Sequence, residues 1–330
     1  MKAIVYQQYG SPEVLEFKDV DKPIPKGNEV LIKVYASSIN SWDWDLLTGK
    51  PYLYRLLFGI LKPKLKILGA DVAGKVVAVG KSVKQFQPGD EVFGDISGCS
   101  WGGFAEYVCA SENVLTHKSI RMTFDEAGAF PQAAVLALQA LRYKGQIKQG
   151  QTVLINGAGG GVGTFALQIA KSYGAEVTCV DSTDKLDMLT SIGADHVIDY
   201  TKQDFTKNGK RYDLILDVVA HRSIFDSNRS LNPKGIYVMV GGSIARIFQI
   251  AFLGPWISMT GKKMGILMHV PNTSDLKMMN EFFEAGNVAP VIDKRYPLSE
   301  VAEALRYFGQ ARVKGKVVIT VGEKRKAGIK

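Results

Sequence analysis

A glycine-rich stretch between an apolar run and a helical segment restricts the fold of this chain more than any other feature. Residues 152–155 form a continuous apolar run, which is typical of a buried parallel strand. Residues 156–163 read Asn-Gly-Ala-Gly-Gly-Gly-Val-Gly, and residues 164–173 continue with helical spacing. A strand, a tight turn of small residues and a helix, in this order, predict the first unit of a doubly wound parallel sheet.

The turn itself has the composition of a phosphate-binding loop. Ala158, Gly160 and Gly163 match the spacing of the dinucleotide-binding fingerprint, with alanine in place of its first glycine. Small residues let the backbone approach a pyrophosphate, and the following helix offers unpaired N–H groups and the positive end of its dipole. We therefore predict that a nicotinamide dinucleotide binds here. The residues predicted to contact it in this turn and after a later strand are Ala158, Gly159, Gly160, Gly161, Val162, Gly163, Gly241 and Gly242.

The pattern of expected secondary structure changes once along the chain. Residues 1 to about 120 hold short strands punctuated by proline and glycine, as in a folded-over barrel. From about residue 125, strands alternate with helices, which implies a parallel sheet with right-handed crossovers. The strand expected at residues 316–320 could return to pair with the first part of the chain. We therefore expect one domain from residues 1–124 and 270–330, and a dinucleotide-binding domain from residues 125–269.

The bulk composition is that of an ordinary globular protein and disfavours several other classes. The chain has 330 residues, which is long enough for two domains. Its three cysteines form no CxxC pair and no disulfide framework, which fits a reducing compartment. We expect a cytoplasmic location, because the sequence shows neither a signal-peptide pattern nor an apolar stretch that could span a bilayer. The net charge of +9 is interpreted as attraction to anionic cofactors, since no basic run with interleaved aromatic residues indicates nucleic-acid binding.

Motifs spread over the whole chain resemble those of the medium-chain dehydrogenase/reductase superfamily. They lie at residues 1–5, 69–74, 88–94, 102–108, 156–163, 193–200 and 315–319. Within the superfamily, the chain resembles the zinc-independent quinone oxidoreductase branch, near its reticulon-interacting-protein-like and plant envelope quinone oxidoreductase-like members. The resemblance implies a GroES-like distorted β-barrel catalytic domain and a Rossmann domain, with the active site between them and hydride transfer as the reaction.

The resemblance also implies that this chain holds no catalytic zinc. Zinc-dependent relatives bind the metal with Cys, His and Cys, and the first two positions are Asn40 and Ala70 here. The third position falls within residues 131–137, which contain neither cysteine nor histidine. Since a catalytic zinc needs three protein ligands, we expect no metal site.

Two signals conflict over which dinucleotide is used. Asp181 ends the second expected strand, where a carboxylate accepts hydrogen bonds from the ribose hydroxyls and repels a 2′-phosphate, which favours NADH. Ser182 and Thr183 match NADPH-using relatives, and Lys185 adds a nearby cation. We expect NADPH to be preferred and NADH to be usable, because the positive net charge also helps the more anionic cofactor.

The catalytic residues are expected in residues 38–45, which resemble the Asn-x-x-Asp segment that lies beside the nicotinamide in this family. Without a Lewis acid, a primary alcohol is a poor substrate, whereas a quinone or an α,β-unsaturated carbonyl accepts hydride more readily. Asn40 is expected to donate to the substrate oxygen, and Asp43 to orient Asn40 or the backbone. Asp45 stands where relatives often carry Tyr or Lys. A carboxylate ionised at neutral pH is a poor acid, so protonation by water is the simpler hypothesis.

Aromatic residues next to this segment predict an apolar substrate pocket. Trp44, Tyr52 and Tyr54 are expected to line it, with residues 56–58 and 247–259 as its walls. Core packing, a homodimer interface or contact with a membrane surface are the alternatives for these apolar segments. The expected substrate is a small apolar quinone or carbonyl compound.

Three functions follow from these features. The favoured one is an NAD(P)H-dependent reductase of quinones or α,β-unsaturated carbonyls. A 2-enoyl thioester reductase is the second, because positive charge would attract the phosphates of coenzyme A. The third is a cofactor-binding regulatory protein with little catalytic activity, since a fold does not imply an activity.

Overall fold

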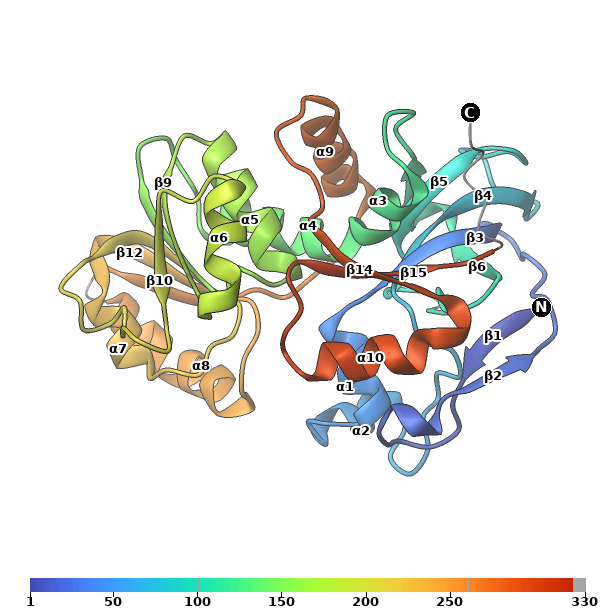
Figure 1. The fold of residues 1–330 in the computed structure, drawn as a ribbon, viewed down its shortest axis with the longest axis horizontal. Helices are drawn as coiled ribbons and strands as arrows, with labels where there is room; N and C mark the ends of the chain where they lie inside the picture. Colours follow the sequence, from blue (N-terminus) through green and yellow to red (C-terminus); the bar gives the residue numbers. More distant parts are fainter. Residues whose placement is uncertain (100, 260, 323–330) are drawn as a thin grey trace. The chain divides into compact units, whose positions relative to one another are not determined.

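The computed structural model describes residues 1–99, 101–259 and 261–322, which Figure 1 shows as a ribbon. These residues group into two units. The first unit contains residues 1–132, 271–280 and those from Ile292 onward, and the second contains residues 133–270 and 281–291. The first unit is therefore assembled from both ends of the chain.

A mixed, mostly antiparallel sheet forms the centre of the first unit. Within the described residues it has seven strands in the order β14-β15-β3-β4-β5-β7, with β6 also paired to β3. Their bounds are β3 (Glu29–Ile39), β4 (Asp71–Val79), β5 (Glu91–Asp95), β6 (Tyr107–Ser111), β7 (Leu115–His117), β14 (Ile292–Pro297) and β15 (Lys316–Thr320). The long strand β3 is mostly buried because it pairs with β15, β4 and β6. The sheet confirms the expected β-rich domain, and β15 returns to it as predicted.

Short helices and a strand pair complete the first unit. They are β1 (Lys2–Val5), β2 (Glu16–Asp19), α1 (Ser41–Thr48), α2 (Leu53–Phe58), α3 (Phe124–Ala129), most of α9 (Thr273–Glu284) and α10 (Val301–Gly309). Side chains from β1, α1 and α10 meet those of the sheet in one apolar core, which includes Ile4, Leu47, Leu305 and, from β3, Ile32. Helix α1 begins directly after β3, so the chain turns from sheet to helix at Asn40.

A parallel sheet of six strands forms the second unit. The strands are β8 (Thr152–Asn156), β9 (Glu176–Asp181), β10 (His196–Asp199), β11 (Tyr212–Asp217), β12 (Leu231–Met239) and β13 (Lys263–Ile266). They lie in the order β10-β9-β8-β11-β12-β13. Counted from β8, this is the order 3-2-1-4-5-6 of a Rossmann sheet, whose winding reverses between β8 and β11. The predicted doubly wound sheet is therefore confirmed, and ligands bind such sheets at the carboxyl ends of the strands.

Helices connect the parallel strands. They are α5 (Gly161–Ser172), α6 (Leu186–Ser191), α7 (Ile224–Arg229) and α8 (Ile244–Ser258), while α4 (Pro131–Leu138) precedes the first strand β8. The apolar run at 152–155 forms β8. The apolar residues 247–259 fall mainly in α8, which packs beside α7 and on β13. None of the described helices is long and apolar enough to cross a membrane.

The two units differ from the expected domain bounds in two places. Helix α3 groups with the first unit because it packs on β3, β4 and β15. Residues 281–291 group with the second unit, where Gln168 exchanges hydrogen bonds of 2.9 Å with Ala289.

Candidate active site

The glycine turn between β8 and α5 is shaped by backbone contacts that exclude larger side chains. Gly157 has a φ of +81°, a left-handed conformation that favours glycine. A Cβ on Gly163 would lie 2.4 Å from the Gly157 oxygen, so glycine is needed for close packing of helix on strand. A Cβ on Gly160 would meet only the Gly157 oxygen, at 3.7 Å, and would otherwise point into open space. Gly160 therefore faces the side from which a phosphate could approach.

The N-terminus of α5 lies at this open side. The helix begins at Gly161, and its N-cap residue Gly160 offers no side-chain hydrogen bond. The first N–H groups of a helix have no acceptor within the helix, and they carry the positive end of its dipole. Helix α5 is 12 residues long, so its aligned peptide dipoles add up at these N–H groups. The turn fits the pyrophosphate of a dinucleotide, because it combines free donors with an absence of side chains.

Asp181 is tied to the turn rather than exposed to solvent. It ends β9, and its Oδ2 accepts a 2.7 Å hydrogen bond from the Gly159 N–H. Its Oδ1 accepts from the Ser182 N–H at 2.9 Å and lies 3.3 Å from Lys185 Nζ. Asp181 and Lys185 are only 6% and 8% exposed, so they form a buried ion pair against the loop. The structure thus brings Asp181, Ser182 and Lys185 together with the turn.

Thr183 and the two later glycines have different surroundings. The Thr183 hydroxyl donates to Asp199 Oδ2, and the Thr201 hydroxyl donates to Asp199 Oδ1. Together these two hydrogen bonds hold the pKa of Asp199 below its usual range. Gly241 and Gly242 follow β12. The Gly241 carbonyl accepts a 3.0 Å hydrogen bond from the N–H of Ala220, a residue that follows β11. The two glycines therefore lie at the carboxyl edge of the sheet, as do the glycine turn and Asp181.

In the first unit, Asp43 organises the backbone at the start of α1. Its Oδ2 accepts from the Asn40 N–H at 2.8 Å, and its Oδ1 accepts from the Gly69 N–H at 2.9 Å. The side chain is fully buried. Burial raises the pKa of Asp43 to about 7, although both hydrogen bonds act in the opposite direction. Asp43 therefore positions two backbone segments, and it does so from within the core.

Asn40 lies between two buried charged side chains. Its Nδ2 donates to Asp71 Oδ2 at 2.9 Å, and its Oδ1 accepts from Lys316 Nζ at 2.6 Å. Lys316 Nζ also lies 3.4 Å from Asp71 Oδ2. The Ser38 hydroxyl and the Gln132 N–H complete the hydrogen bonds to Asp71. Burial raises the pKa of Asp71, while Lys316 acts to lower it.

Asp45 lies on the opposite side of α1 from Asp43 and has a different environment. Its side chain is partly buried, and its carboxylate has no hydrogen-bond partner among the described residues. Burial alone raises the pKa of Asp45 to about 6. The nearby carboxylate contributes to the raised pKa of Tyr54, after burial itself. Asp45 is therefore a better acid near neutral pH than a carboxylate with an ordinary pKa would be.

The expected pocket residues do not gather in one place. Trp44 packs its ring against α10, where a Cβ on Gly309 would lie 2.3 Å from Trp44 Cη2. Tyr52 is 67% exposed, with the Arg55 guanidinium over its ring. Tyr54 instead stacks on Trp42 with ring centroids 5.9 Å apart. Tyr54 lies near Asp45, whose charge acts on the Tyr54 hydroxyl.

Trp42 is the centre of an aromatic cluster that the sequence did not indicate. It stacks on Tyr54 and on Trp101, and meets the edge of Phe58 at 6.2 Å. Trp42 and Asp45 are three residues apart, and because α1 is helical, they share one of its faces. Trp44 lies on a different face. Asp71 and Lys316 were also missed as functional residues. The motif at residues 69–74 includes Asp71 and the motif at residues 315–319 includes Lys316, but neither assigns a role.

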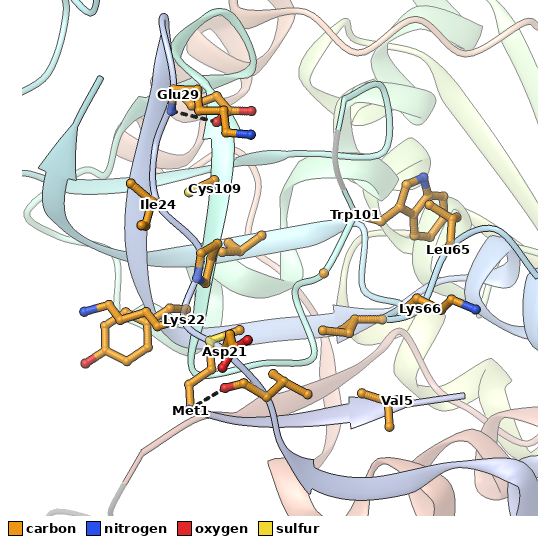
Figure 2. Close-up of a pocket in the computed structure, with 17 residues that line it drawn as sticks. Met1, Val5, Asp21, Lys22, Ile24, Glu29, Leu65, Lys66, Trp101 and Cys109 are labelled. Atoms are coloured by element: carbon orange, nitrogen blue, oxygen red, sulfur yellow. Dashed lines mark hydrogen bonds between the residues drawn. The ribbon is translucent and has the colours of Figure 1, made fainter. Parts of the chain in front are cut away.

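A hollow elsewhere in the first unit contains none of the expected site residues. Figure 2 shows this cavity of about 790 Å³, which is lined by Met1, Lys22, Leu65 and Trp101 among others. The Lys22 ammonium lies 3.8 Å from the centroid of the Tyr107 ring on its wall. The cavity shares only Trp101 with the aromatic cluster. Among the described residues there is also no group of three or more His, Cys, Asp or Glu side chains that could hold a metal ion.

Two known domain families match separate parts of the chain. Residues 26–120 match the family described as alcohol dehydrogenase GroES-like domain, and residues 192–319 match the family described as zinc-binding dehydrogenase. The first match covers much of the mixed sheet and α1. The second begins within the parallel sheet and ends in β15.

Relatives match nearly the whole chain. A chloroplast envelope quinone oxidoreductase homolog of Arabidopsis thaliana is 33% identical, over 97% of this chain and 98% of that protein. An NADPH-dependent alkenal/one oxidoreductase of the same plant is 32% identical, over 97% of this chain and 79% of the relative. Among solved structures, the quinone oxidoreductase from Coxiella burnetii superposes with a TM-score of 0.88 at 30% identity, covering 98% of this chain and 99% of that one.

Proposed function

Because the chain belongs to the quinone oxidoreductase-like branch of the medium-chain dehydrogenase/reductase superfamily, we propose that it is an NAD(P)H-dependent reductase of quinones or α,β-unsaturated carbonyls. The observation that carries the proposal is the glycine turn at the carboxyl edge of the Rossmann sheet. Its open face at Gly160 and the free N–H groups of α5 fit a pyrophosphate. The names of the two plant relatives supply the acceptor class, quinones in one and alkenals or alkenones in the other.

The cofactor would be held by the residues that surround the turn. A bound reduced nicotinamide supplies the hydride. Backbone N–H groups at Gly161 to Gly163 would receive the pyrophosphate, and Gly241 and Gly242 lie at the same edge of the sheet. Asp181 keeps the loop in place through its bond to the Gly159 N–H.

The surroundings of Asp181 support NADPH as the preferred cofactor. Its carboxylate is already paired with Lys185 and bonded to two backbone N–H groups, so its negative charge is partly compensated. A compensated carboxylate repels a 2′-phosphate less than a free one. Lys185 and the hydroxyl of Ser182 lie next to it and could turn toward such a phosphate. NADH remains usable, since Asp181 could also accept from ribose hydroxyls.

The substrate oxygen would be bound by the side-chain amide of Asn40. Negative charge develops on this oxygen as hydride arrives, and a fixed donor stabilises it. Asp45, whose pKa burial raises to about 6, joins water as a source of the proton that completes the reaction. We propose that the reaction needs no zinc, because the positions of the zinc ligands in relatives hold Asn40 and Ala70 instead. The cytoplasmic location and the homodimer stay predictions.

A substrate panel tests this proposal. NADPH and NADH oxidation is followed with the purified protein and a quinone, an enal, an enone or an enoyl thioester. We expect turnover with quinones or with enals and enones, and more with NADPH. Preference for the thioester would favour an enoyl thioester reductase. Tight dinucleotide binding without turnover of any acceptor would favour a regulatory protein.

A further inference from the structure

Three strands of the first unit bring distant residues to the Asn40 side chain. Strand β15 pairs antiparallel with β3, with Val317 opposite Ile39. Lys316, one residue before Val317, is therefore directly opposite Asn40, one residue after Ile39. Strand β4 lies on the other side of β3 and begins at Asp71. The sheet thus places a cationic side chain on one side of the Asn40 amide and an anionic side chain on the other.

The hydrogen bonds of this group allow only one orientation of the amide. A lysine ammonium can only donate, and an ionised carboxylate can only accept. The amide oxygen must therefore face Lys316, at 2.6 Å, and the amide nitrogen must face Asp71, at 2.9 Å. Exchanging the two amide atoms would set donor against donor and acceptor against acceptor. The charged pair thus fixes what is otherwise ambiguous for an asparagine.

This orientation leaves one N–H of the amide free. The Nδ2 atom carries two hydrogens, and Asp71 accepts one of them. The other has no acceptor among the described residues, and Asn40 is 7% exposed. The ammonium next to Oδ1 also draws electron density toward the amide oxygen, which makes the remaining N–H a stronger donor.

We propose that Lys316 and Asp71 are positioning residues that fix and polarise the Asn40 amide, so that its second N–H is presented to the substrate oxygen. This inference rests on the proposed function, in which Asn40 donates to that oxygen. Both residues act only through Asn40 and do not contact the substrate. A purely stabilising role is a weak alternative, because burying an ion pair costs much of what the pair returns. Lys316 and Asp71 are only 2% and 0% exposed.

A double-mutant cycle separates positioning from stability. We expect Asn40→Ala to lower kcat for an enone about 100-fold, which is the usual loss for one such donor. Lys316→Met should lower kcat about 10-fold, with little change in KM or in the Kd of NADPH. In the Asn40→Ala background, Lys316→Met should cause no further loss, because nothing remains for it to orient. The inference would be overturned if the double variant lost the product of the two single losses in kcat, or if kcat were unchanged in Lys316→Met.

Two further variants keep the test decisive if Lys316→Met folds poorly. Lys316→Arg retains the cation and should keep more activity than the methionine variant. Asp71→Asn has the same shape but removes the negative charge, and its NH2 group must face one of the donors that now bond the two carboxylate oxygens. It should lower kcat without additivity to Asn40→Ala. Lys118→Met is the matched control. Its side chain is 5% exposed and paired with Glu91, and it has no contact with Asn40, so kcat should not change even if stability falls.

Hydrogen exchange of the Asn40 amide gives a readout independent of turnover. The side-chain resonances are assigned by their absence in Asn40→Ala. In the wild type we expect one protected proton, bonded to Asp71, and one that exchanges faster. In Lys316→Met and Asp71→Asn the difference between the two should be lost. Equal exchange in the wild type would overturn the inference, whereas absent turnover with unequal exchange would instead count against the proposed function.

Discussion

Lys316 Nζ donates to Asn40 Oδ1 at 2.6 Å, although 276 residues separate the two in sequence. The contact exists because β15, near the end of the chain, pairs with β3 near its beginning. It places a buried cation against the one neutral polar side chain expected to meet the substrate. The first unit therefore supplies a fixed amide donor whose orientation depends on strands from both ends of the chain.

Replacing Gly160 by valine should cripple dinucleotide binding without unfolding the protein. The added side chain would stand in the open space where the pyrophosphate belongs, since its Cβ would meet only the Gly157 oxygen at 3.7 Å. Calorimetric titration with NADPH measures the loss. Gly163→Ala is the matched control, and there the Cβ would lie 2.4 Å from the Gly157 oxygen, so the melting temperature itself should fall. Unchanged NADPH affinity in Gly160→Val would mean that the cofactor binds elsewhere.

Replacing Asp181 by alanine should raise the ratio of NADPH affinity to NADH affinity. The substitution removes an acceptor for ribose hydroxyls and leaves Lys185, now 3.3 Å from the carboxylate, free to pair with a 2′-phosphate. It also removes the acceptor of the Gly159 N–H, so both affinities can fall together. For that reason the ratio is the quantity to compare, and Asp181→Asn serves as a control that keeps an acceptor. A ratio that does not move would show that Asp181 does not select the cofactor.

Asp45 should give the protein a recognisable pH dependence of stability. Its pKa is raised to about 6 in the folded protein, so the folded state binds the proton more tightly than the unfolded chain does. Stability is then lost as pH rises from about 4 to about 6. The penalty at higher pH is about 3 kcal/mol, because the pKa rises from 3.8 to about 6 and each pKa unit is worth about 1.4 kcal/mol. Asp45→Asn removes this contribution, while that of Asp43, whose pKa is raised to about 7, remains, so the dependence should become weaker.

Melting curves of wild type and Asp45→Asn at pH 4 and pH 8 measure the effect. We expect the melting temperature of the variant, taken relative to that of the wild type, to be higher at pH 8 than at pH 4. If Asp45 also supplies the proton, the wild-type kcat should fall as pH rises through about 6, and the variant should lack this step. Parallel melting curves at both pH values would rule out a raised pKa at this residue.

The purified protein should carry no stoichiometric zinc and keep full activity in a strong chelator. Three ligands of N, S or O type are needed for a catalytic zinc, and Asn40 and Ala70 stand where relatives have two of them. Metal analysis together with turnover after chelation decides the matter. One zinc per chain whose removal abolishes turnover is the opposite result.

The cofactor half of the site was predictable because its signal is local. Residues 152–163 contain the strand, the turn and the start of the helix within one short segment, and the structure forms β8 and α5 there as predicted. Asp181 was predicted because it ends the second expected strand. Its bond to the Gly159 N–H was not predicted, because it depends on how β9 packs beside β8.

The substrate half was less predictable because it depends on pairing between distant strands. No spacing rule connects Lys316 or Asp71 to Asn40, since the register of β15, β3 and β4 is set only in the folded sheet. The choice of Trp44 over Trp42 has a local cause. Residues 41–48 were not recognised as a helix, and helical geometry places Trp42 on the face of Asp45 while Trp44 turns toward α10.

Isotope transfer tests the central claim, that this protein moves a hydride from a nicotinamide to an activated alkene. The protein is incubated with an enone and NADPH that carries deuterium on both hydrogens at C4 of the nicotinamide. We predict that the saturated product contains one deuterium, at the carbon β to the carbonyl, and that product and oxidised cofactor form in equal amounts. Product without deuterium, or cofactor oxidation without saturated product, would contradict the proposed reaction.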